Sequence, residues 1–163
     1  MSVSINPIIS MTAQETLDTG VAAASNPAIT HSGFNLNSSS LNANTTPPVT
    51  TASYQKYTLD GSGDATIDLT ALLGVANESQ DATGLKVQTV IVKNPAGNAT
   101  LTISPGASNP YPLNGTGNDI EVPAGSTFGL YFADTLADVA ASVKEIDIAG
   151  GAAETFQLGI CLG

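Results

Sequence analysis

The carboxylates of DGSGDATID, which begins at Asp60, come closest to a known chemistry in type and spacing. Asp60, Ser62 and Asp64 lie at alternate positions, as do the first ligands of a calcium-binding loop. Such a loop needs Gly at its sixth position and Glu at its twelfth, where this chain has Ala65 and Ala71. The segment is therefore interpreted as a turn whose carboxylates are solvated.

A weak cation site at this segment is kept as an alternative interpretation. Asp64 and Asp68 could share a cation at a subunit contact, but no other group of metal-ligating residues stands out in the sequence. A zinc cluster needs several Cys or His residues, whereas the chain has one imidazole, His31, and one thiol, Cys161. We expect no cofactor and no resident metal.

The inventory of nucleophiles and bases argues against catalysis. Four lysines and no arginine stand against fourteen Asp and Glu residues. His31 has no G-x-S-x-G motif to accompany it, and Cys161 lies in an apolar run that predicts a buried, inert thiol. A hydrolase that uses only Asp and Glu stays open as an alternative, but we expect that the protein is not an enzyme.

The charge balance excludes two classes of partner. The formal net charge is −10 and the lysines form no cluster, so the sequence predicts neither nucleic-acid binding nor docking on an anionic membrane. No run of 18 apolar residues occurs, and the N-terminal segment lacks a cationic region before an apolar one. We expect the chain to fold in a cytoplasm, without disulfides.

Residues 53–163 show the alternation of apolar and polar residues that is typical of strands. Residues 54–60 and 65–73, joined by GSGD, are predicted to form a hairpin. Val90–Val92 predicts a central strand that is covered on both faces, and Asp134 would cap a short helix over 134–142. Seven or eight strands with Gly, Pro and Asn turns predict an all-β antiparallel sandwich of jelly-roll type, with an immunoglobulin-like sandwich as the alternative.

Residues 1–52 differ in composition and predict an extended N-terminal arm. They are rich in Ser, Thr, Asn and Pro, so they cannot bury enough apolar area to order alone. A flexible linker or an integral part of the fold are the alternatives. The arm is favoured because isolated apolar residues are spread along it, namely Ile8, Ile9, Leu17, Ile29, Phe34, Leu36 and Leu41.

The loop NPYPLNGTGND offers a candidate for ligand binding. An exposed Tyr111 ring with the amide of Asn118 could bind a sugar, although the chain has only eight aromatic residues and no Trp. A glycan- or receptor-binding domain, of a fibre or of a cell-surface protein, is therefore kept as the alternative function.

The segments HSGFN, TPPVT, ATIDLTALLG, GLKVQTVIVKNPAGNATLTI and ETFQLGICLG, taken in order, carry a resemblance to a known class. Over about residues 30–163 the chain resembles the head decoration, or cement, proteins of tailed bacteriophages, in which a short N-terminal arm precedes an all-β domain. The resemblance implies a protein on the capsid exterior that is assembled in the host bacterial cytoplasm. It also implies the major capsid protein as partner and a homotrimer as the assembly.

This resemblance assigns a role to each part of the chain. The arm would order against neighbouring capsomers and staple them, while the sandwich would form the three-fold centre of the trimer. The residues predicted to contact the partner are Ile29, Phe34, Leu36 and Leu41.

Overall fold

The computed structural model describes residues 4–5, 10–16, 28–35, 41–74, 78–115, 117–132 and 135–163. The chain divides into two compact units, one of residues 1–5 and 41–163 and one of residues 6–40. The strand β5 begins at Thr51, two residues before the predicted start of the domain, and residues 41–49 already belong to the larger unit.

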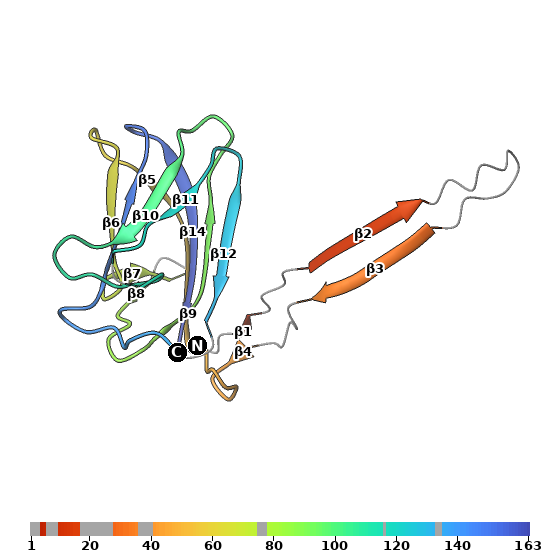
Figure 1. The fold of residues 1–163 in the computed structure, drawn as a ribbon. Coiled ribbons are helices and arrows are strands. Elements are labelled where there is room, and N and C mark those ends of the chain that lie inside the picture. The colour runs from red at the N-terminus through yellow and green to blue at the C-terminus, as the bar shows by residue number, and fades with distance from the viewer. Residues whose placement is uncertain are drawn as a thin grey trace, which may run out of the picture. The chain divides into compact units, whose positions relative to one another are not determined.

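The larger unit is built on two antiparallel sheets of four strands each (Figure 1). The first, which we call the lysine-bearing sheet, has the order β12 (Thr127–Tyr131), β9 (Val87–Lys93), β14 (Thr155–Leu162), β5 (Thr51–Thr58). The second, the acidic sheet, has the order β11 (Ile120–Val122), β10 (Leu101–Pro105), β13 (Glu145–Ala149), β6 (Asp64–Asp68). The predicted all-β sandwich is confirmed. The strand order is compatible with the jelly-roll type, which stays a prediction.

Two short pairs of strands complete the larger unit. β7 (Leu72–Leu73) pairs with β8 (Ser79–Gln80), and β1 (Ser4–Ile5) pairs with β4 (Leu41–Asn42). The smaller unit is described as one antiparallel ribbon, in which β2 (Ser10–Thr16) pairs with β3 (Ala28–Asn35).

The alternation in sequence explains which side chains form the core between the two sheets. Along β14, Phe156, Leu158, Ile160 and Leu162 are buried, and each residue between them faces the other side. Other strands also direct alternate, apolar side chains into this core. Their inward members include Val90, Val92, Leu101, Ile103, Ile146 and Ile148, and the partly buried Phe128, Leu130 and Phe132 pack against the same core. These inward faces confirm the alternation predicted from the sequence.

The predicted hairpin of residues 54–73 is wrong. β5 pairs along its whole length with β14, and β6 pairs with β13, so the turn at 60–63 carries the chain from one sheet to the other. Neighbours in the sequence are therefore not neighbours in a sheet here, and the partner of β5 is the distant strand β14. The pairing of Thr51 with Leu162 extends through eight residues to that of Thr58 with Thr155.

Two other local predictions are also corrected. Residues 135–142 contain no helix, because their backbone bonds elsewhere: the Val139 amide donates to the Leu85 carbonyl oxygen (2.8 Å) and the Val139 carbonyl accepts from Gly84 (2.9 Å). Asp134, the predicted cap, lies outside the described residues. β9 is an inner strand as expected, but it is not covered on both faces, since 43% of Ile91 is exposed.

Candidate functional site

The residues predicted to contact a partner fall into different parts of the structure. Ile29 and Phe34 lie in β3 of the smaller unit, and Leu36 lies outside the described residues. Leu41 begins β4 and is only 2% exposed. That these four residues contact a partner stays a prediction, with Leu41 placed among the buried side chains of the larger unit.

The candidate nucleophile has an environment that suppresses its reactivity. Cys161 lies on β14, where burial raises the pKa of its thiol to about 11. At neutral pH the thiol is therefore protonated, and the thiolate is the form that attacks electrophiles. His31, the only imidazole, lies in β3 of the smaller unit.

The carboxylates of residues 60–68 serve the turn and do not converge. Asp60 Oδ1 accepts hydrogen bonds from the amides of Asp64 (3.0 Å) and Ser62 (2.7 Å), and these bonds lower the pKa of Asp60. Asp64 and Asp68 lie at the two ends of β6, about 13 Å apart along the strand, which is too far for one shared cation. Among the described residues, no group of three His, Cys, Asp or Glu side chains is placed to hold a metal.

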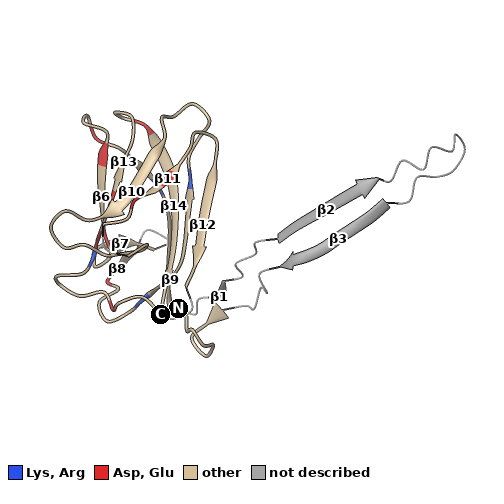
Figure 2. Cartoon of the chain, viewed as in Figure 1, with Lys and Arg blue, Asp and Glu red and all other residues tan. Residues whose placement is uncertain are grey.

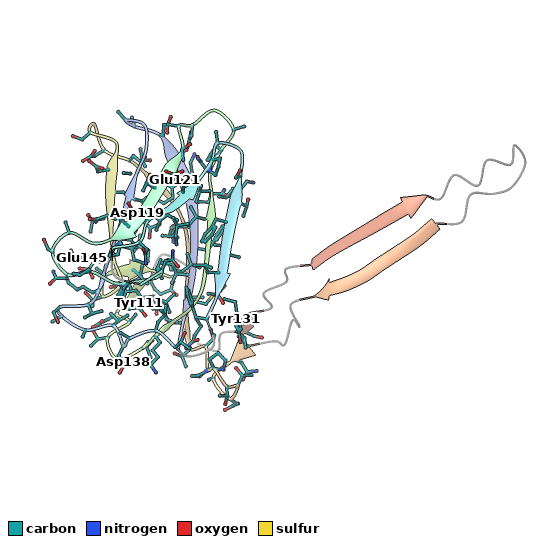
Figure 3. The ribbon with its side chains drawn as sticks, in the orientation of Figure 1. Tyr111, Asp119, Glu121, Tyr131, Asp138 and Glu145 are labelled. Carbon is teal, nitrogen blue, oxygen red and sulfur yellow. The ribbon has the colours of Figure 1, made fainter. Side chains whose placement is uncertain are left out.

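Tyr111, the expected exposed ring, is fully buried (Figure 3). Its hydroxyl accepts a hydrogen bond from the Val87 amide (3.0 Å) and donates one to the Ala137 carbonyl oxygen (2.8 Å). Desolvation by burial raises the pKa of this phenol. The loop is drawn inward because the amides of Gly106 and Tyr111 both donate to the Glu145 carbonyl oxygen, each at 2.8 Å. The ring joins elements of the core and is not available to stack on a sugar.

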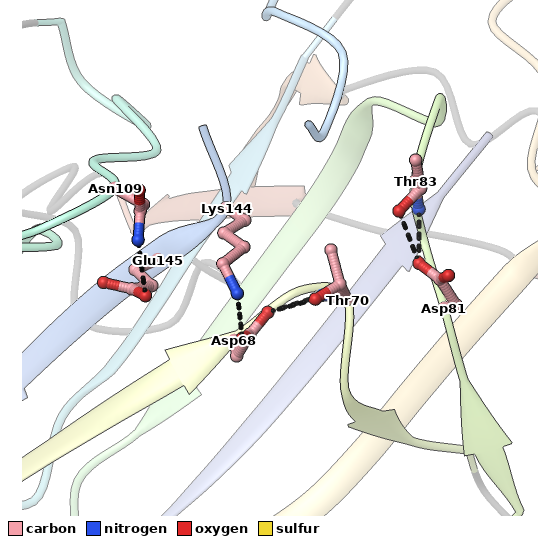
Figure 4. Close-up of polar contacts among 7 residues, drawn as sticks. All are labelled: Asp68, Thr70, Asp81, Thr83, Asn109, Lys144 and Glu145. Carbon is pink, nitrogen blue, oxygen red and sulfur yellow. Dashed lines mark hydrogen bonds and ion pairs between the residues drawn. The ribbon is translucent and has the colours of Figure 1, made fainter. Parts of the chain in front are cut away.

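Several polar side chains near the end of the acidic sheet form hydrogen bonds and ion pairs with one another (Figure 4). Asp68 accepts hydrogen bonds from Lys144 Nζ (2.6 Å) and from the Thr70 hydroxyl (2.7 Å). In a second pair, Asn109 Nδ2 donates to Glu145 Oε1 (3.0 Å). Each carboxylate here has a local partner, as expected of groups that hold strands and loops together.

The outward face of the lysine-bearing sheet carries a row of three side chains that sequence reasoning missed. Gln157 of β14 pairs with Lys56 of β5 on one side and with Lys93 of β9 on the other. Both lysines are exposed, and neither forms an ion pair with a described residue. The other two lysines are paired within the chain, Lys86 with Asp138 at 3.9 Å and Lys144 with Asp68 at 2.6 Å.

This lysine row borders a pocket and an apolar row. A pocket of about 250 Å³ is lined by Lys56, Lys93, Pro95, Thr155, Phe156 and Gln157. Two residues along each strand, Gly159 pairs with Tyr54 and with Ile91, which are 58% and 43% exposed. These are two of the three large apolar residues that are most exposed in the described part of the chain.

The two sheets differ sharply in charge (Figure 2). The four strands of the lysine-bearing sheet contain no Asp or Glu. The four strands of the acidic sheet contain no Lys and five carboxylates: Asp64, Asp68, Glu121, Glu145 and Asp147. Of the described surface, the lysine-bearing face therefore differs most from the net-negative character of the whole chain, and we take it as the candidate functional surface.

The chain matches no protein-family model and none of the curated proteins. Within the described residues, no helix has the length and apolar character needed to cross a membrane.

Proposed function

We propose that the protein is a structural virion protein that decorates the exterior of a tailed-phage capsid and cements neighbouring capsomers. Its partner in this proposal is the major capsid protein, its assembly is a homotrimer, and it is assembled in the bacterial cytoplasm. The resemblance of residues 30–163 to head decoration proteins motivates the proposal, and the all-β sandwich agrees with what that resemblance implies.

The observation that carries the proposal is the separate unit of residues 6–40. Its described part is a ribbon of only two strands, β2 and β3, and each strand has one edge without a described partner. Two-stranded sheets are marginally stable in water, whereas a third strand or an apolar surface stabilises them. Such a ribbon suits a clamp that orders against a neighbour, because edge pairing supplies backbone hydrogen bonds without demanding a particular sequence.

Stoichiometry in the intact particle tests this proposal. Quantitative mass spectrometry of purified virions should give a copy number of the same order as that of the major capsid protein. A protein that is absent from virions, or present in only a few copies, would contradict it.

Receptor or glycan binding is the competing function. It predicts few copies per particle and binding to a glycan array, whereas the decoration function predicts neither. The burial of Tyr111 removes the one aromatic ring on which the sugar-binding interpretation relied. A reproducible glycan hit that is lost when the 106–118 loop is altered would restore that alternative.

A further inference from the structure

We propose that the outward face of the lysine-bearing sheet docks onto an acidic protein surface, with a partner carboxylate entering the pocket between Lys56 and Lys93. The identification of that partner with the capsid protein rests on the proposed function. The docking face itself is argued from contacts, exposure and charge within the larger unit.

The lysine row has the geometry of a carboxylate site. Lys56 and Lys93 lie one strand to either side of Gln157, so their Cα atoms are about 10 Å apart. Two flexible lysine side chains at this separation can direct their ammonium groups to one carboxylate. The side-chain amide of Gln157 lies in the same row and can donate a further hydrogen bond. The pocket beside them, about 250 Å³, is large enough for an Asp or Glu side chain.

The adjoining row supplies apolar contact. Tyr54 and Ile91 lie on either side of Gly159. Because Gly159 has no side chain, it leaves both residues accessible to a partner. A Cβ atom at position 159 would come within 3.3 Å of the Tyr54 ring, so the ring lies over the glycine. Protein interfaces commonly place an exposed aromatic residue beside charged groups at the rim, as this face does.

Charge complementarity identifies the kind of partner. The chain carries −10 overall, and two of its four lysines are neutralised by Asp68 and Asp138. The two lysines without a described acidic partner stand together on a sheet whose strands have no carboxylate. An acidic surface is thus repelled by most of the molecule and attracted by this face, which orients the encounter as well as stabilising the complex.

A second copy of this chain is the less favourable occupant. Two lysine-bearing faces would repel each other if they met. The acidic face of another copy has the right charge, but it lies on the opposite side of the sandwich from the lysine-bearing face. Head-to-tail stacking through opposite faces repeats without closing into a ring. A different protein with exposed carboxylates fits both the charge and the geometry.

Zero-length cross-linking with a carbodiimide tests the contact, because it joins a lysine only to a carboxylate that touches it. Intact particles that carry the protein are cross-linked, and the joined peptides are identified by mass spectrometry. We expect Lys56 and Lys93 to be joined to Asp or Glu of another protein. Links from Lys56 or Lys93 to Asp64 or Glu121 of a second copy would overturn the choice of partner. Links at Lys86 and Lys144 but none at Lys56 or Lys93 would overturn the docking face while leaving decoration intact.

A second measurement keeps the docking face testable if the protein is absent from virions and the proposed function fails. The purified full-length chain is titrated with poly-L-glutamate at low ionic strength and followed by amide NMR. Shifts should concentrate on β5, β9 and β14, and K56E and K93E should each weaken binding about tenfold.

K86E is the matched control, since each of these three exchanges changes the net charge from −10 to −12, one positive charge being replaced by one negative. We expect K86E to alter binding less than twofold. Equal weakening by all three variants, or shifts spread over the whole domain, would mean a non-specific charge effect and would overturn the proposal. K56Q and K93Q replace the Glu variants if circular dichroism shows that those do not fold.

Discussion

At the scale of single residues, Tyr111 shows how a polar atom fixes a loop inside the core. Its hydroxyl connects the Val87 amide of β9 with the Ala137 carbonyl, two backbone groups that are far apart in sequence. We expect Tyr111→Phe to lower the free energy of unfolding by about 1–3 kcal/mol, because it leaves the buried Val87 amide unpaired and removes the donor to the Ala137 carbonyl oxygen. Urea unfolding, with an unchanged m-value, measures the loss.

Tyr54→Phe is the control for that measurement. The Tyr54 hydroxyl makes only a long hydrogen bond to Gln157 Oε1 (3.3 Å), and the residue is 58% exposed. Loss of the Tyr54 hydroxyl should change the free energy of unfolding by less than about 0.5 kcal/mol. Similar losses in the two variants would show that burial of the Tyr111 hydroxyl is not what stabilises the loop.

Asp68 makes stability depend on pH in a defined direction. Burial raises the pKa of its carboxyl, but the hydrogen bonds from Lys144 and Thr70 outweigh burial, and the net pKa is lowered. A carboxyl whose pKa is lower in the folded than in the unfolded chain stabilises the fold above about pH 4, and this contribution is lost as the pH falls through the folded pKa. Asp68→Asn should therefore cost up to about 1 kcal/mol at pH 7, since the ion pair is partly exposed.

The pH profile separates this effect from a general loss of packing. The difference between the wild type and Asp68→Asn should shrink below pH 4, when measured by urea unfolding across the pH range. Asp64→Asn, at the other end of β6, serves as the control. A difference that stays constant down to pH 2 would argue that Asp68 acts through its shape and not its charge.

At the scale of elements, the turn at residues 60–63 is the first of several points where the chain passes from one four-stranded sheet to the other. Gly63 has φ +90°, and a Cβ atom there would collide with the carbonyl oxygen of Gly150. We expect Gly63→Ala to destabilise the protein by about 2 kcal/mol or more, from the positive φ together with the collision. Thermal unfolding followed by circular dichroism measures it. Gly61→Ala is the control, because a Cβ atom there meets nothing within 4 Å. If the two alanine variants had the same melting temperature, the turn would not require glycine at position 63.

The elements also show what sequence alone could predict. The inward faces of β10, β12 and β14 follow from alternation, which is a local property of each strand. The pairing of β5 with β14 joins residues about a hundred positions apart, so no local pattern could reveal it. For the same reason the lysine row was missed. Lys56 and Lys93 are neighbours only through the register of Gln157, although each stands two residues from an exposed apolar side chain, Tyr54 or Ile91.

At the scale of the whole molecule, stability and attachment are assigned to different parts of the chain. Among the residues whose burial the structure describes, every member of the buried apolar cluster lies between Leu59 and Leu162, in the larger unit. The smaller unit is a compact unit of its own. Cooperative unfolding should therefore depend on the larger unit alone, because it contains the area whose burial stabilises the fold.

Deletion of residues 6–40, with residue 5 joined to residue 41 by a short Gly-Ser linker, tests that separation. We expect the melting temperature and the urea m-value per residue of the larger unit to stay close to those of the full chain, since β1 and β4 keep their pairing. Under the proposed function the same variant should be incorporated into particles far less well than the full chain, because the ribbon that would order against a neighbour is gone.

K56E supplies the comparison. It keeps the ribbon and alters the docking face, so its incorporation should fall with unchanged stability and with a distinct dependence on salt. If the deletion variant unfolded without cooperativity, residues 6–40 would belong to the folding unit, and the assignment of stability to the sandwich alone would fail.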